Sequence, residues 1–299
     1  MNVRIAKTAG FCYGVNRAVD LVEQTIAAGK KAVTLGPIAH NRHLVDRFEK
    51  LGVKSVNTVD EIPVGYTVIL RSHGVPRSTY EALVERNVEV IDATCPSVKR
   101  IHKLVSAAEE QGRRAVIIGT PTHPEIVAIA GWCENPLIFS DADALEKWLM
   151  EDPENANLPI TMVSQTTSTQ KLWDSCKKIA KKVCTNREIF DTICKATENR
   201  QEEAAQIAAQ SEAMIVVGDV NSSNTGQLAN ICKQHCDNVA LVDSAKDIDP
   251  EKYQSYYNIG ITAGASTPAW IIKEVNKTMS EIKNVDVVEE SFEDRKSVV

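Results

Sequence analysis

The chain has 299 residues, of which 43% are hydrophobic and 25% charged, and its formal net charge is −6 at pH 7. This length and composition are those of a globular protein with a large core, and they exclude a low-complexity or disordered chain. The acidic balance argues against nonspecific nucleic-acid binding, and apolar runs too short to cross a bilayer argue against a membrane protein.

In chain order, three segments share one pattern. They cover residues 11–41, 94–125 and 193–224, and each contains near its start a cysteine that is followed by about four turns of amphipathic helix. An apolar strand, a glycine and a polar loop come next. From the cysteine, the glycine follows after 24 residues and a polar loop residue after 28 in every segment. These positions are Cys12, Gly36 and His40; Cys95, Gly119 and His123; and Cys194, Gly218 and Ser222.

A second half follows each segment and completes a repeat. It reads strand, polar loop, helix, and it covers residues 64–87, 158–182 and 256–279. A further strand leads into each cysteine, within residues 3–12, 88–95 and 187–194. Strands that alternate with helices predict mostly parallel sheets, whose ligands lie at the carboxyl ends of the strands.

We therefore predict an α/β fold: a trefoil of three α/β units related by a pseudo-threefold axis. The units cover residues 1–94, 95–193 and 194–283, and residues 284–299 form a tail or linker. Such an arrangement directs three cysteines and six polar loops toward one centre. The second half of the third repeat contains Thr267 and Pro268, which we expect at the N-cap and the first position of its helix.

The N-terminus lacks the apolar stretch of a secretion signal, so we expect a cytoplasmic protein whose eight cysteines are thiols or ligands. Cys12, Cys95 and Cys194 occupy equivalent positions at helix starts, where the helix dipole favours a thiolate. The others are expected to be small buried side chains, namely Cys133, Cys176, Cys184 and the pair Cys232 and Cys236, which is a weak alternative metal site.

Three converging thiolates could bind zinc, but structural zinc sites usually draw on CxxC pairs, and the sequence has none. An iron-sulfur cluster fits better. A 4Fe-4S cluster with three cysteine ligands leaves one iron open to a substrate oxygen, which indicates catalysis rather than electron transport alone.

Polar residues follow the predicted strands. His40, His73 and His123 are candidate ligand-binding residues, whereas His43, His102 and His235 are expected on the surface or in packing. Glu125 is a candidate proton donor, or alternatively a first-turn helix carboxylate. The hydroxyl and amide groups could bind an anion, cap helices or do both; they belong to Thr166, Thr167, Ser222, Ser223, Asn224 and Ser266. Neither GxxxxGK[ST] nor GxGxxG occurs, so nucleotide binding has no support.

Over about residues 1–283 the chain closely resembles the 4-hydroxy-3-methylbut-2-enyl diphosphate reductase family. The resemblance rests on the motifs GFCYGV, GPIAHN, RSHGV, DATCP, THPE, SQTT, DTICKAT, NSSNT and TAGAST. It implies a three-lobed α/β trefoil around one 4Fe-4S cluster held by Cys12, Cys95 and Cys194, which oxygen can convert to 3Fe-4S on isolation. The implied reaction removes an allylic hydroxyl as water and yields isopentenyl and dimethylallyl diphosphate, with ferredoxin or flavodoxin as electron donor.

The resemblance also implies residue roles. Glu125 supplies the proton, and Thr166 and Thr167 lie near the hydroxyl and relay. The diphosphate is surrounded by His40, His73, His123, Ser222, Ser223, Asn224 and Ser266, and Thr197 is a further candidate for this shell. We expect a monomer. Two other functions stay open from sequence: an iron-sulfur hydro-lyase that expels water without net reduction, and a non-catalytic binding module with structural cysteines.

Overall fold

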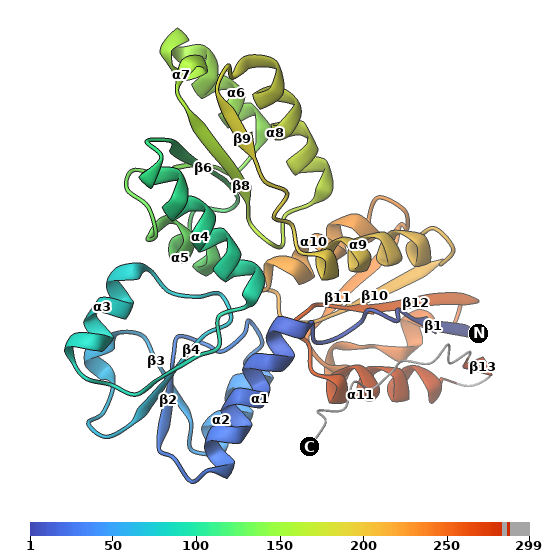
Figure 1. Cartoon of the computed structure of the whole chain (residues 1–299). Coiled ribbons are helices and arrows are strands. Elements are labelled where there is room, and N and C mark those ends of the chain that lie inside the picture. Colours follow the sequence, from blue (N-terminus) through green and yellow to red (C-terminus); the bar gives the residue numbers. More distant parts are fainter. Residues whose placement is uncertain (283–285, 288–299) are drawn as a thin grey trace. The chain divides into compact units, whose positions relative to one another are not determined.

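The computed structural model describes residues 1–282 and 286–287 (Figure 1). Its strands form three sheets, with the orders β11-β10-β12-β1-β13, β3-β2-β4-β5 and β7-β6-β8-β9. The strand pairs within all of these sheets are parallel. The predicted α/β fold with three parallel-sheet units is therefore confirmed. Among the described residues, no helix combines the length and apolar character needed to cross a membrane.

The chain folds into two compact bodies. Body 1 comprises Met1–Asp20, Ala39–Lys50 and the chain from Lys195 onward, and body 2 comprises Leu21–Ile38 and Leu51–Cys194. Helix α1 (Tyr13–Ala27) begins in body 1 and ends in body 2. The predicted boundaries at 94/95 and 193/194 follow the sequence repeat and stay a prediction about domains. The predicted tail, residues 284–299, lies outside the described residues apart from Asp286–Val287.

Body 2 contains two of the sheets. The elements of the first are β2 (Ala32–Leu35), β3 (Lys54–Val56), the 3-10 helix η1 (Val59–Glu61), β4 (Thr67–Leu70), α3 (Arg77–Glu85) and β5 (Val90–Asp92). Those of the second are α4 (Pro96–Glu110), β6 (Arg114–Ile118), α5 (Pro124–Ala130), β7 (Leu137–Phe139), α6 (Ala142–Glu151), α7 (Pro153–Asn157), β8 (Ile160–Ser164), α8 (Gln170–Val183) and β9 (Arg187–Ile189).

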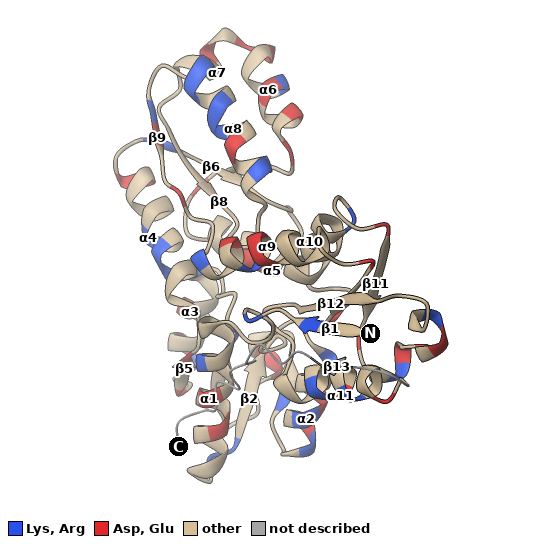
Figure 2. Cartoon of the chain, turned by 90° about the vertical axis from the view of Figure 1, so that its right-hand side faces the viewer, with Lys and Arg blue, Asp and Glu red and all other residues tan. Residues whose placement is uncertain are grey.

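The second sheet of body 2 is covered on both faces because its central strands are apolar on both sides. Along β6, Val116 and Ile118 pack with α6 and α8 around Trp173. Ala115 and Ile117, which point the other way, pack with α4 and α5. Strand β8 has no Lys, Arg, Asp or Glu, as Figure 2 shows. This double burial is what a parallel sheet requires.

Body 1 contains the third sheet and its helices. Its elements are β1 (Asn2–Ile5), α2 (Arg42–Lys50), α9 (Lys195–Ala208), β10 (Ala213–Val217), α10 (Ser223–Cys232), β11 (Asn238–Val242), the 3-10 helices η2 (Ala245–Asp247) and η3 (Pro250–Tyr253), β12 (Asn258–Ala263), α11 (Ala269–Ser280) and β13 (Asp286–Val287). The predicted start of α11 is wrong by one residue. Pro268 occupies the N-cap, and the Thr267 hydroxyl donates to the carbonyl of Val217.

The strand that precedes each of the three predicted cysteine ligands occupies the same place in its sheet. β5 precedes Cys95 and pairs with β4, and β9 precedes Cys194 and pairs with β8. β1, which precedes Cys12, pairs with β12, with Val3 opposite Ile259. The N-terminal strand thus joins the sheet of the third repeat rather than that of the first, and it follows the same rule of strand order as the other two.

Candidate active site

Glu125, the one acid among the predicted site residues, is buried. It lies in the first turn of α5 and is 2% exposed. Its two carboxyl oxygens accept hydrogen bonds from the backbone N–H and the hydroxyl of Thr166, each at 2.6 Å. Burial raises the pKa of Glu125, and the two bonds from Thr166 oppose that rise. Glu125 is therefore an acid whose burial favours its neutral form and whose carboxyl group is in direct contact with a hydroxyl.

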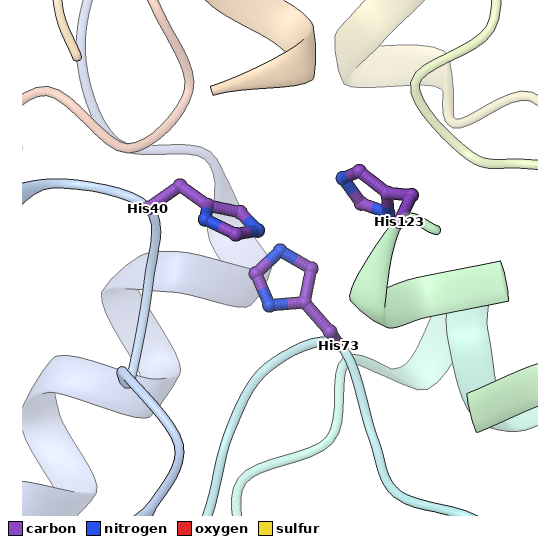
Figure 3. A group of neighbouring side chains, drawn as sticks. All are labelled: His40, His73 and His123. Atoms are coloured by element: carbon purple, nitrogen blue, oxygen red, sulfur yellow. The ribbon is translucent and has the colours of Figure 1, made fainter. Parts of the chain in front are cut away.

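His73 and His123 lie together in body 2 (Figure 3). Their ring centroids are 5.6 Å apart in an edge-to-face arrangement. His123 caps α5, and its Nδ1 accepts the N–H of Glu125 at 3.1 Å. An imidazole whose Nδ1 accepts a hydrogen bond carries its proton on Nε2 when neutral, so His123 presents an uncharged donor. His40, drawn in the same figure, belongs to body 1.

The loop that carries His73 is supported from α4. Gly74 has a φ of +76°, and a Cβ at this position would come within 2.7 Å of Cε1 of His102. His102 is buried and stacks on Trp132, with ring centroids 5.0 Å apart. Burial lowers the pKa of His102 to about 4, so it is neutral at pH 7. This confirms the prediction that His102 is a packing residue.

The two predicted cysteine ligands of body 2 are tied by backbone hydrogen bonds to the site loops. The N–H of Cys95, the N-cap residue of α4, donates to the carbonyl of Ser72 at 2.9 Å. The N–H of Cys194 donates to the carbonyl of Thr166 at 3.0 Å, and α9 begins at the next residue. Both thiols are half-buried. Thr167 accepts a hydrogen bond from the Gln165 amide at 2.7 Å.

Body 1 brings a neutral set of groups together. The N–H of Cys12 donates to the carbonyl of Ala265. The N–H of Ala265 in turn donates to Oδ1 of Asn224 at 3.0 Å. The Ser266 hydroxyl donates to the carbonyl of His40 at 2.8 Å and lies 3.5 Å from the Ser222 hydroxyl. Ser222 caps α10, and Ser223 is the first residue of that helix.

Asn224 carries the clearest open donor of this set. Its side chain is 3% exposed, and its amide nitrogen has no hydrogen-bond partner among the described residues. A buried, unsatisfied donor is costly unless a ligand completes it, and here it lies at the N-terminus of α10, where the helix dipole favours anions. The predicted Thr197 is buried on α9.

The remaining cysteines differ from the three site cysteines. Cys176, Cys184, Cys232 and Cys236 are buried, and Cys133 is half-buried. Burial raises the pKa of Cys133 and of Cys176 to about 11 and that of Cys232 to about 12. Thiols with such pKa values are poor metal ligands, because metals bind the thiolate. Cys232 and Cys236 are part of the apolar core of body 1.

Sequence reasoning missed two residues of α9 that hold the loop ahead of Cys12. The Arg200 guanidinium donates to the carbonyls of Thr8 and Gly10, at 2.6 and 2.7 Å from Nη2. The Glu203 carboxylate accepts from the N–H groups of Lys7 and Thr8, both at 2.8 Å. An Arg and a Glu three residues apart on one helix were the only signal in the sequence, and such pairs are common on solvated faces.

A family model described as LytB protein matches residues 3–280. The chain belongs to the LytB family. A LytB relative from Clostridioides difficile (strain 630), named 4-hydroxy-3-methylbut-2-enyl diphosphate reductase, is 40% identical over 92% of this chain and 98% of the relative. A relative of the same name from Nitratiruptor sp. is 37% identical over 95% of this chain and 100% of the relative. Another from Clostridium tetani is 39% identical over 94% of this chain but only 44% of the relative.

Solved structures agree with the LytB assignment. A structure of (E)-4-hydroxy-3-methyl-but-2-enyl diphosphate reductase, the terminal enzyme of the non-mevalonate pathway, is 35% identical, with a TM-score of 0.67 over 94% of this chain and 99% of that chain. A reductase from Plasmodium falciparum, 24% identical with a TM-score of 0.86 over 95% of this chain and 91% of that chain, shares the fold. The LytB relatives are named as reductases, which confirms the prediction that this chain is an oxidoreductase.

Proposed function

We propose that this LytB protein catalyses the reductive dehydroxylation of (E)-4-hydroxy-3-methylbut-2-enyl diphosphate to isopentenyl diphosphate and dimethylallyl diphosphate. The overall reaction consumes two electrons and two protons. The allylic C–O bond breaks, one proton leaves with the hydroxyl as water, and the other forms the new C–H bond. The observation that carries the proposal is the buried contact between the Glu125 carboxyl and Thr166, because this reaction needs a protonated acid beside the departing hydroxyl.

Cys12, Cys95 and Cys194 are the residues that would hold one 4Fe-4S cluster per chain. They fit this group because they are half-buried thiols at the starts of three helices, whereas four of the other five cysteines are buried. Thiolate sulfurs are the usual ligands of iron-sulfur clusters, and loss of the iron without a thiolate would give a 3Fe-4S form. When bound, the cluster would supply the electrons and one Lewis-acidic iron for the substrate hydroxyl.

The body 1 residues bind the diphosphate in this proposal. Hydroxyl donors on Ser222, Ser223 and Ser266, the Asn224 amide and the N-terminus of α10 offer hydrogen bonds to phosphate oxygens. Histidine donors from His40, His73 and His123 complete the set. Neutral donors can hold a diphosphate without a competing metal ion, and they leave the nearby acid free of a permanent counter-charge.

Glu125 donates the proton to the departing hydroxyl. The raised pKa of Glu125, caused by its burial, keeps the carboxyl protonated at a higher pH than a solvated glutamate. Thr166 lies between this acid and the backbone of Cys194, so its hydroxyl is suited to relay the proton. Thr167 is likewise assigned to the hydroxyl end of the substrate. We infer ferredoxin or flavodoxin as electron donor, a monomeric state and a cytoplasmic location.

The test is anaerobic purification, reconstitution with iron and sulfide, and measurement of iron content and of substrate consumption with and without dithionite. We expect about four irons per chain and reductant-dependent formation of both five-carbon products. Turnover without a reductant would contradict the reductase and indicate a hydro-lyase. Zinc in place of iron would contradict the reductase altogether, whereas full activity of Glu125→Gln would contradict the role of Glu125 as proton donor.

A further inference from the structure

A cavity of about 260 Å³ lies in body 2, at the carboxyl ends of strands in its first sheet. It is lined by the first residues after three neighbouring strands, Gly36 after β2, Asn57 after β3 and Arg71 after β4, and by Thr79 of α3. Ligands of parallel sheets bind at the carboxyl ends of strands, so the position itself suits a ligand. None of the predicted site residues lines this cavity.

The guanidinium of Arg71 is held in place inside this cavity. Its Nε donates to the carbonyl of Gly74 at 3.3 Å. It also lies flat against Gly36, where a Cβ would approach Nη1 to 2.8 Å, and the φ of Gly36 is +72°. Glycine is therefore required at position 36 both for the backbone conformation and for the close approach of the guanidinium. A side chain fixed at Nε and along its plane presents its terminal N–H groups in one orientation.

Arg71 has no counter-charge in the cavity. No Asp or Glu lines it, and the acids of the adjacent 3-10 helix are engaged elsewhere, Asp60 with Arg86 and Glu61 with the backbone N–H of Asn57 and the hydroxyl of Thr58. Within residues 1–282, the side chain of Arg71 makes one hydrogen bond, which is the one to the carbonyl of Gly74. The side chains of Asn57 and Thr79 likewise make no hydrogen bond in that part of the chain. Three polar side chains with open hydrogen-bonding groups thus line one cavity.

We propose that this cavity is a binding site for a small oxyanion, a phosphate or carboxylate group carried by a metabolite. The two terminal nitrogens of Arg71 match the paired oxygens of such a group, and no acid in the cavity repels it. The Thr79 hydroxyl and the Asn57 amide supply further donors, while Val59, Val75 and Pro76 form an apolar wall for the rest of the ligand. No residue assigned to the substrate site lines this cavity, and the proposal does not depend on the proposed reaction.

The test is calorimetric titration of the reconstituted protein with inorganic phosphate and, separately, with acetate. Arg71→Met removes the guanidinium and is expected to weaken one binding event about tenfold or more, since a hydrogen-bonded charge pair is lost. Arg71→Lys keeps the positive charge but loses the paired N–H groups of the guanidinium. Its affinity should fall between those of the wild type and Arg71→Met. Arg100→Met is the matched control, because it removes an exposed arginine on α4 of the same body. It should titrate like the wild type.

Thr79→Val keeps the fold, and we expect it to weaken the same event about threefold to tenfold through the loss of one hydroxyl. Melting curves without added anion establish that each variant is folded. Phosphate can also bind at the proposed substrate site, so only differences from wild type count. Equal affinities in wild type, Arg71→Met and Thr79→Val would overturn the proposal, and so would an equal loss in Arg100→Met. Preference for phosphate over acetate, or the reverse, identifies the head group.

Discussion

The site residues of the two bodies differ in chemistry. In body 1, the side chains of Ser222, Asn224 and Ser266 are neutral and form hydrogen bonds to one another or to the backbone. The amide nitrogen of Asn224 has no partner among the described residues. In body 2, Glu125 is an acid whose buried carboxyl contacts Thr166, and His123 is an imidazole fixed by its own helix. In the proposed function this difference corresponds to a partial division of labour. The hydroxyl and amide donors that bind the diphosphate come from body 1, whereas the proton donor comes from body 2, which also contributes His73 and His123 to binding.

The largest expected effect comes from the cysteines, which both bodies supply. Cys12→Ser in body 1 and Cys95→Ser in body 2 should each abolish stable cluster binding and activity, because serine is a poor substitute for a thiolate. Iron and sulfide analysis after anaerobic reconstitution measures this. Cys133→Ala, which removes a half-buried thiol outside the site, should retain the full iron content. A Cys12→Ser protein with normal iron content would show that body 1 supplies no ligand.

Glu125→Gln should lower kcat about a hundredfold or more and leave KM nearly unchanged, because the amide keeps the shape of the side chain but donates no proton. Steady-state kinetics with dithionite as reductant separates the two constants. Glu134→Gln, an exposed substitution on the same body, is the control. A rise in KM without a change in kcat would place Glu125 among the binding groups and break the division between the bodies.

Ser266→Ala tests the body 1 half of the comparison. Loss of one hydroxyl donor to a charged diphosphate should raise KM about tenfold, with a small effect on kcat. Ser280→Ala removes an exposed hydroxyl at the end of α11 and should change neither constant. If Ser266→Ala instead lowers kcat at unchanged KM, body 1 takes part in the chemical step.

The smallest expected effect is the pH dependence of stability, to which Glu125 and His102 contribute in opposite directions. The pKa of Glu125 is raised, so its contribution is present below the unfolded-state pKa and is lost as pH rises through the folded-state value. His102 acts in the opposite direction. Its pKa falls from 6.5 to about 4, so its contribution is present above pH 6.5 and is lost as pH falls toward 4.

Denaturant unfolding between pH 4 and pH 8 measures both contributions. His102→Gln should flatten the acid limb of the stability curve, by about 3 kcal/mol at most, since each pKa unit corresponds to 1.36 kcal/mol. Glu125→Gln should flatten the opposite limb. If the stability curve of His102→Gln keeps the acid slope of the wild-type curve, a group other than His102 causes that slope.

The repeat could be predicted from sequence because the apolar periodicity and the cysteine spacing recur in all three copies. The pairing of β1 with β12 could not be predicted, because the sequence of a four-residue strand does not identify the strand with which it pairs. Thr267 illustrates a local limit: a hydroxyl before Pro268 fits an N-cap, yet it bonds to Val217 on a neighbouring strand. The contact of Glu125 with Thr166 joins residues 41 positions apart, and sequence alone left this acid indistinguishable from a first-turn carboxylate.

The place of β1 also sets an order of events during synthesis. Strands β2 to β9 lie within residues 32–189, so both sheets of body 2 can close while the later residues are still being made. Among the described residues, β1 pairs with β12 and β13, which are both made after residue 257. Body 1 therefore closes after body 2, through a pairing of long sequence separation, which is the slow kind of contact to form.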